Sequence, residues 1–107
     1  MNLHRLAEER SLAYHRAVAD RLRREPALVA VARQRVAGWL AEGRSPRYAA
    51  AWHDVLARSL DDVIAVMTDA GERARALRQA TPFAGMIDPR ERWRIWRDVK
   101  RRELGGP

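Results

Sequence analysis

The strongest chemical signal in this sequence is a group of tryptophans and arginines near its C-terminus. Trp93 and Trp96 are three residues apart, so a helix would place them on neighbouring parts of one face. Arginine beside tryptophan serves cation–π pairing, phosphate binding and the hot spots of protein interfaces. The pattern predicts a binding surface, and it contains no catalytic motif. Four arginines repeat at four- and three-residue spacing beside this pair: Arg90, Arg94, Arg97 and Arg101.

The same residues have a second interpretation that requires no partner. Paired tryptophans at helical spacing are most often core residues, and the arginines would then only solvate the outer side of the helix. The net charge is +7, and 20 of the 21 basic residues are arginine, Lys100 being the exception. Arginine favours bidentate contacts with phosphate and carboxylate, but a GC-rich coding bias would produce the same excess. Both interpretations stay open here.

A loop with many apolar side chains precedes this helix. Phe83, Met86 and Ile87 follow a proline closely, and burying them requires partners for the backbone polar groups of the loop. Either the loop folds back so that Phe83 covers the core beside Trp93, or it presents an apolar patch with the arginines as its rim. We expect a mixture in which Phe83 is mostly buried. Met86, Ile87, Arg90 and Arg94 would then contact a partner protein or a second copy of the chain. The predicted partner-binding residues are Phe83, Met86, Ile87, Arg90, Trp93, Arg94 and Arg97.

Residues 60–80 have the outline of a helix-turn-helix unit. Gly71 lies in a short turn between two expected helices, and three arginines, Arg73, Arg75 and Arg78, would line the second helix. Arginines suit phosphate and guanine contacts, although Glu72 adds negative charge at the end that should meet DNA bases. A stand-alone DNA-binding transcriptional regulator is therefore the alternative function. Its predicted nucleic-acid-binding residues are Arg73, Arg75, Arg78 and Arg101.

No group of residues in the sequence has the spacing of a catalytic or metal site. The sequence has no cysteine, which excludes disulfides, thiolate zinc sites and thiol catalysis. His4, His15 and His53 lie far apart, share no metal-ligand spacing with carboxylates, and are interpreted as surface histidines. The sequence also has no glycine-rich phosphate loop and no pair of carboxylates arranged for acid–base catalysis. We therefore predict that the protein is not an enzyme and uses no cofactor or metal.

The length of 107 residues predicts one domain, 1–107, with a modest core. No apolar run approaches the length of a membrane span. Glu8 and Glu9 interrupt the region where a signal peptide needs an apolar stretch. We expect a soluble cytoplasmic protein that does not bind membranes.

Short helices should position all of these residues, because apolar residues recur near the 3.6-residue period and no stretch alternates long enough for a strand. Ser45 and Asp88 each precede a proline at a helix start, Ser59 and Asp69 begin capping boxes, and Gly43 is placed to end a helix. The sequence predicts an all-α domain of five or six short helices. Their expected ranges are 2–24, 26–42, 46–58, 60–67, 69–80 and 88–102. The expected core consists of Val29, Val36, Trp39, Leu40, Trp52, Val55, Leu56, Val63, Ile64, Met67 and Leu77.

Residues 77–101, LRQATPFAGMIDPRERWRIWRDVKR, resemble a group of small helical bacterial proteins of toxin–antitoxin operons. The earlier stretches SLAYHRAVADRL and RSLDDVIAV are similar in style. The resemblance implies a protein that binds and silences a co-encoded toxin and represses its own promoter, and it assigns no residue roles. This sequence lacks the disordered toxin-wrapping tail and the ribbon-helix-helix strand of common antitoxins. The predicted function is an antitoxin-like, non-catalytic binding protein, with a toxin as its partner and DNA or a second copy of the chain as further candidates.

Overall fold

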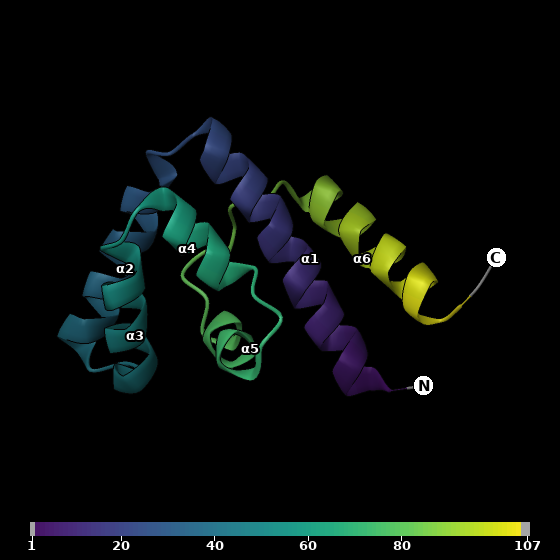
Figure 1. The fold of residues 1–107 in the computed structure, drawn as a ribbon, viewed down its shortest axis with the longest axis horizontal. Coiled ribbons are helices and arrows are strands. Elements are labelled where there is room, and N and C mark those ends of the chain that lie inside the picture. Colours follow the sequence, from purple (N-terminus) through teal and green to yellow (C-terminus); the bar gives the residue numbers. More distant parts are fainter. Residues whose placement is uncertain (1, 106–107) are drawn as a thin grey trace.

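Helices make up most of residues 2–105, which are the residues that the computed structural model describes (Figure 1). The six helices among them are α1 (Leu3–Arg24), α2 (Leu28–Glu42), α3 (Pro46–Leu56), α4 (Leu60–Met67), α5 (Glu72–Gln79) and α6 (Pro89–Glu103). No strand occurs within 2–105. The all-α prediction is therefore confirmed, and so is the predicted number of helices.

Local sequence signals set several of the helix ends. The Ser59 hydroxyl accepts a hydrogen bond from the Asp62 N–H at 3.2 Å and caps α4. The Asp88 carboxylate accepts one from the Arg90 N–H at 2.8 Å and caps α6. Gly43 ends α2 in the left-handed region at φ 69°, where glycine has no Cβ to clash. These three ends were predicted because each depends on residues close together in the sequence.

The starts of α3 and α5 differ from the predicted caps. Ser45 precedes α3 in the left-handed region at φ 44°, and its side chain makes no capping hydrogen bond. α5 begins at Glu72 and not at Asp69. The Asp69 carboxylate instead accepts a hydrogen bond from the Gly71 N–H at 3.0 Å. It therefore shapes the turn before the helix.

The core lies where α1 packs against α4 and α5, with α3 completing it and α2 packed on α3 (Figure 1). Trp52 of α3 is fully buried, and its indole N–H donates to the Leu77 carbonyl of α5 at 3.0 Å. Most of the predicted core residues are buried: Val29, Val36, Trp52, Val55, Leu56, Val63, Ile64, Met67 and Leu77.

Two residues of α2 were wrongly assigned to this core. Leu40 is 41% exposed, and Trp39 is only partly buried. α2 packs mainly on α3, and this cover does not extend over Leu40 in the last turn of α2. The helical period alone could not show where that cover ends.

α6 lies along α1 and packs mainly on that helix (Figure 1). Val99 is the buried residue of α6, and Ile95 is partly buried. Arg5 near the start of α1 donates to the Glu103 carboxylate at the end of α6 at 2.9 Å, so the two helices run in opposite directions. Most of the other side chains of α6 are exposed.

Candidate binding surface

The outer face of α6 combines exposed tryptophan with exposed arginine. Trp93 is 58% exposed and Trp96 is 36% exposed, so the interpretation of this pair as core residues is wrong. Trp93 lies about half a turn around the helix from the inward-facing Ile95 and Val99, because successive residues are about 100° apart. Four predicted arginines are exposed on this helix: Arg90, Arg94, Arg97 and Arg101. We call Arg90, Trp93, Arg94, Trp96, Arg97 and Arg101 the α6 face.

Trp96 is held in place by two guanidinium groups. The Arg10 guanidinium of α1 lies 5.4 Å from the centre of the Trp96 ring, and that of Arg92 lies 5.6 Å from it. Such cation–π contacts contribute about 0.5–1 kcal/mol at an exposed site. Trp96 therefore has intramolecular contacts that fix its orientation. Trp93 is the more exposed of the two and is the better candidate for contact with another molecule.

Most arginines of the α6 face form no ion pair with an acidic side chain of residues 2–105. Arg101 lies 3.9 Å from the Asp98 carboxylate. Within residues 2–105, no carboxylate forms an ion pair with Arg90, Arg94 or Arg97. The face therefore presents positive charge that its own helix does not neutralise.

The loop before α6 belongs to the core and not to this face. Phe83 is fully buried, as predicted, but it packs edge-on against Trp52, with ring centres 5.6 Å apart, and not beside Trp93. Met86 and Ile87 are 4% and 5% exposed and belong to the same core cluster. The predicted contact of Phe83, Met86 and Ile87 with a partner is therefore wrong.

Side chains from α1 and α2 make this burial possible, because they bind the backbone of the loop. The Tyr14 hydroxyl donates to the Phe83 carbonyl at 2.7 Å. The Arg35 guanidinium donates to the carbonyls of Pro82 and Ala84 at 3.0 and 2.6 Å. A buried loop is stable when its polar backbone groups have such partners. No local signal in the sequence could identify Tyr14 or Arg35 as those partners.

His15 extends the same network and corrects its assignment as a surface histidine. It is 1% exposed, with Nδ1 2.7 Å from the Ser11 carbonyl and Nε2 2.8 Å from the Thr81 hydroxyl. A carbonyl can only accept, so Nδ1 carries the proton of the neutral ring and Nε2 accepts from Thr81. Burial lowers the pKa of His15 to about 4, the Ser11 carbonyl opposes this shift, and the charge of Arg78 adds to it. The ring is therefore neutral at neutral pH.

The α4–α5 unit does not present its arginines as a DNA-reading helix would. Arg78 is buried, and its guanidinium donates to the carbonyls of Met67 and Asp69 at 3.2 and 2.6 Å. Its predicted contact with nucleic acid is therefore wrong, because it stabilises the turn between the two helices. Arg75 is exposed but lies 3.7 Å from the Glu8 carboxylate of α1. Of the three α5 arginines in that prediction, Arg73 alone is exposed without an ion pair within residues 2–105.

Comparisons of the chain with protein-family models, with curated proteins and with solved structures found no match in any of the three. Within residues 2–105, no cluster of three or more His, Asp or Glu side chains could hold a metal ion. No helix in that range is long and apolar enough to cross a membrane. The argument for a function therefore depends on the surfaces of the molecule itself.

Proposed function

We propose that this protein is a non-catalytic binding protein and that it contacts a partner protein through the α6 face. The exposure of Trp93 beside arginines that have no ion pair within residues 2–105 supports this proposal most directly. Tryptophan and arginine dominate the hot spots of protein interfaces. Hydration of a large exposed aromatic ring is unfavourable, so burying the ring in an interface would lower the free energy.

The charge of α6 favours an acidic partner surface. The helix has seven basic side chains and three acidic ones, and the whole chain has a net charge of +7. Complementary charge accelerates encounter and selects against wrong partners more than it adds affinity. The partner should therefore carry a cluster of carboxylates around a pocket that receives Trp93.

The proposed partner is a toxin encoded beside this protein, which the protein binds and silences in the cytoplasm. The resemblance of residues 77–101 to small helical proteins of toxin–antitoxin operons supports this choice. α6 supplies most of that stretch, so the segment with the resemblance is also the segment with the exposed surface.

The alternative proposal, a stand-alone DNA-binding regulator, receives less support. Arg78 is engaged in the turn between α4 and α5, and Arg75 lies near Glu8. A phosphate-binding role would instead fall to the arginines of the α6 face. Binding to DNA would then weaken with salt by a log–log slope of about −0.9 for each neutralised phosphate.

Calorimetric titration of the purified neighbouring gene product with this protein tests the proposal. Trp93→Ala should weaken binding by about thirtyfold or more, since a hot-spot truncation costs about 2 kcal/mol or more. Arg94→Glu should also weaken binding, because it reverses a charge of the α6 face. Arg47→Glu, a charge reversal at an exposed arginine of α3, is its matched control and should leave the affinity unchanged.

Two results would contradict the proposal. The first is a Trp93→Ala variant that keeps its thermal transition and binds the neighbouring product as tightly as the unmodified chain does. The second is the absence of any binding together with no rescue of growth when the neighbouring gene is expressed. If the protein shifts duplex DNA in a mobility assay and Arg94→Glu abolishes the shift, the α6 face binds DNA and the regulator alternative is supported.

A further inference from the structure

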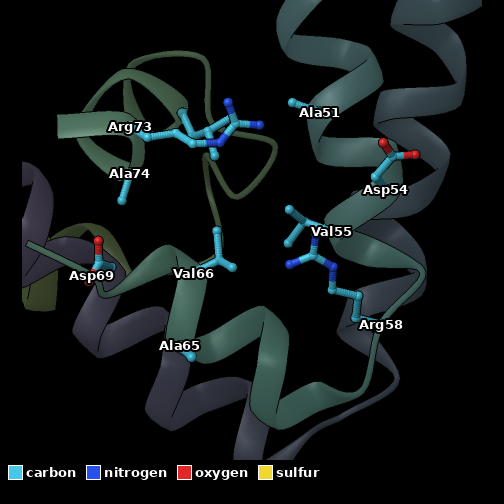
Figure 2. Close-up of a pocket in the computed structure, with 10 residues that line it drawn as sticks. Ala51, Asp54, Val55, Arg58, Ala65, Val66, Asp69, Arg73 and Ala74 are labelled. Carbon is cyan, nitrogen blue, oxygen red and sulfur yellow. The ribbon is translucent and has the colours of Figure 1, made fainter. Parts of the chain in front are cut away.

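A pocket of about 310 Å³ lies between α3, α4 and α5, apart from the α6 face (Figure 2). Val55 of α3, Val66 of α4 and Leu77 of α5 form its apolar wall, together with small alanine side chains. A volume of this size is at the lower end of the range for small-molecule sites, roughly 300–1,000 Å³. The pocket therefore has room for a small organic molecule.

Two guanidinium groups reach into this pocket from opposite sides. Figure 2 shows Arg73 extending from α5 toward Ala51 of α3, while the Arg58 side chain turns back beside Val55. Neither Arg58 nor Arg73 forms an ion pair or a side-chain hydrogen bond with another group in residues 2–105. The pocket therefore combines an apolar wall with two guanidinium groups that have no ion-pair partner within residues 2–105.

The two carboxylates that line the pocket form no ion pair with these guanidinium groups. The Asp69 carboxylate accepts the hydrogen bond from the Gly71 N–H at 3.0 Å, which holds it in the turn before α5. Asp54 points away from both guanidinium groups in Figure 2. An anion with an apolar body would supply what is missing, because guanidinium binds carboxylate through two parallel hydrogen bonds.

We propose that this pocket binds a small organic acid, with its carboxylate between Arg58 and Arg73 and its apolar body against Val55, Val66 and Leu77. A second hollow, lined by Tyr48 and Glu72 among others, adjoins the pocket and shares Ala51, Arg73 and Leu77 with it. This site is independent of the proposed function, because none of its residues belongs to α6. It also assigns a role to Arg73, the one α5 arginine whose guanidinium has no partner within residues 2–105.

Titration of the whole chain with 2-naphthoate tests this proposal, with amide chemical shifts and calorimetry as the two readouts. The amides of Ala51, Val55, Val66 and Leu77 should shift and saturate together. The neutral analogue 2-naphthalenemethanol should bind about tenfold or more weakly, because it removes a charge-assisted hydrogen bond. Naphthyl phosphate tests the choice of carboxylate, and it should bind no more tightly than 2-naphthoate.

Matched variants separate the pocket from the rest of the positive surface. Arg58→Gln and Arg73→Gln should each weaken 2-naphthoate binding by about tenfold and leave the thermal transition in place, since both side chains are exposed. Arg90→Gln on α6 is the control and should not change the affinity.

Four results would overturn the assignment: no saturable binding at millimolar 2-naphthoate, equal binding of the neutral analogue, unchanged affinity in both pocket variants, or shifts that map to α6. If duplex DNA changes the amide chemical shifts of the pocket residues and 2-naphthoate does not, Arg73 contacts nucleic acid instead.

Discussion

Replacing Phe83 with alanine tests whether the loop before α6 is part of the core. Phe83 is fully buried and lies edge-on to Trp52 and His15, with ring centres 5.6 and 6.3 Å apart. Truncation removes the whole ring from a closed site, so the unfolding free energy should fall by about 3–5 kcal/mol. For a domain of this size, each kcal/mol lowers the transition temperature by about 4 °C or more, so a decrease of at least about 12 °C is expected.

Thermal unfolding followed by far-ultraviolet circular dichroism measures this decrease. Trp93→Ala is the matched control, because it truncates a larger aromatic ring at a site that is 58% exposed. Its effect on the unfolding free energy should stay within about 0.5 kcal/mol, as for most surface substitutions. A Phe83→Ala variant as stable as Trp93→Ala would refute the reasoning, because the loop would then contribute nothing to the core.

Three further predictions concern buried polar groups and the same loop. Burial lowers the pKa of His15 from 6.5 to about 4, so the unfolded chain binds the proton more tightly than the folded one does. The stability that depends on the neutral ring should be complete above pH 6.5 and fall by up to about 3 kcal/mol toward pH 4, and denaturant unfolding should show a shallower fall in His15→Phe. Arg78→Met should lower the unfolding free energy by about 1–3 kcal/mol, because it leaves two carbonyls without donors, whereas Arg73→Met should have little effect in the same denaturant assay. Ile87→Asp should abolish the cooperative thermal transition or lower it sharply, since it places a charge at a site that is 5% exposed; an intact transition would return Ile87 to the surface.

Features that depend on neighbouring residues could be predicted from the sequence. The cap at Asp88, the cap at Ser59 and the glycine that ends α2 each act within a few residues. The buried faces of α3 and α4 also followed the helical period, because other helices cover those faces along their length. Helical class and most of the core therefore required no knowledge of tertiary contacts.

Features that depend on distant residues could not be predicted in this way. Burial of the loop requires Tyr14 to reach Phe83 across 69 positions and Arg35 to reach Pro82 across 47. Whether an arginine of α5 is buried or exposed depends on how α5 lies against α4, and the two outcomes occur at Arg78 and Arg73. The sequence pattern identified the helix but not its neighbours.

The indole N–H resonances of the four tryptophans offer the most direct test of the α6 face. In a nitrogen–proton correlation spectrum, addition of the neighbouring gene product should shift or broaden the indole signal of the exposed Trp93. The signal of Trp52, whose indole N–H is buried and bonded to Leu77, should stay in place. A saturated complex in which the Trp93 signal is unchanged would contradict the claim that this face binds the partner.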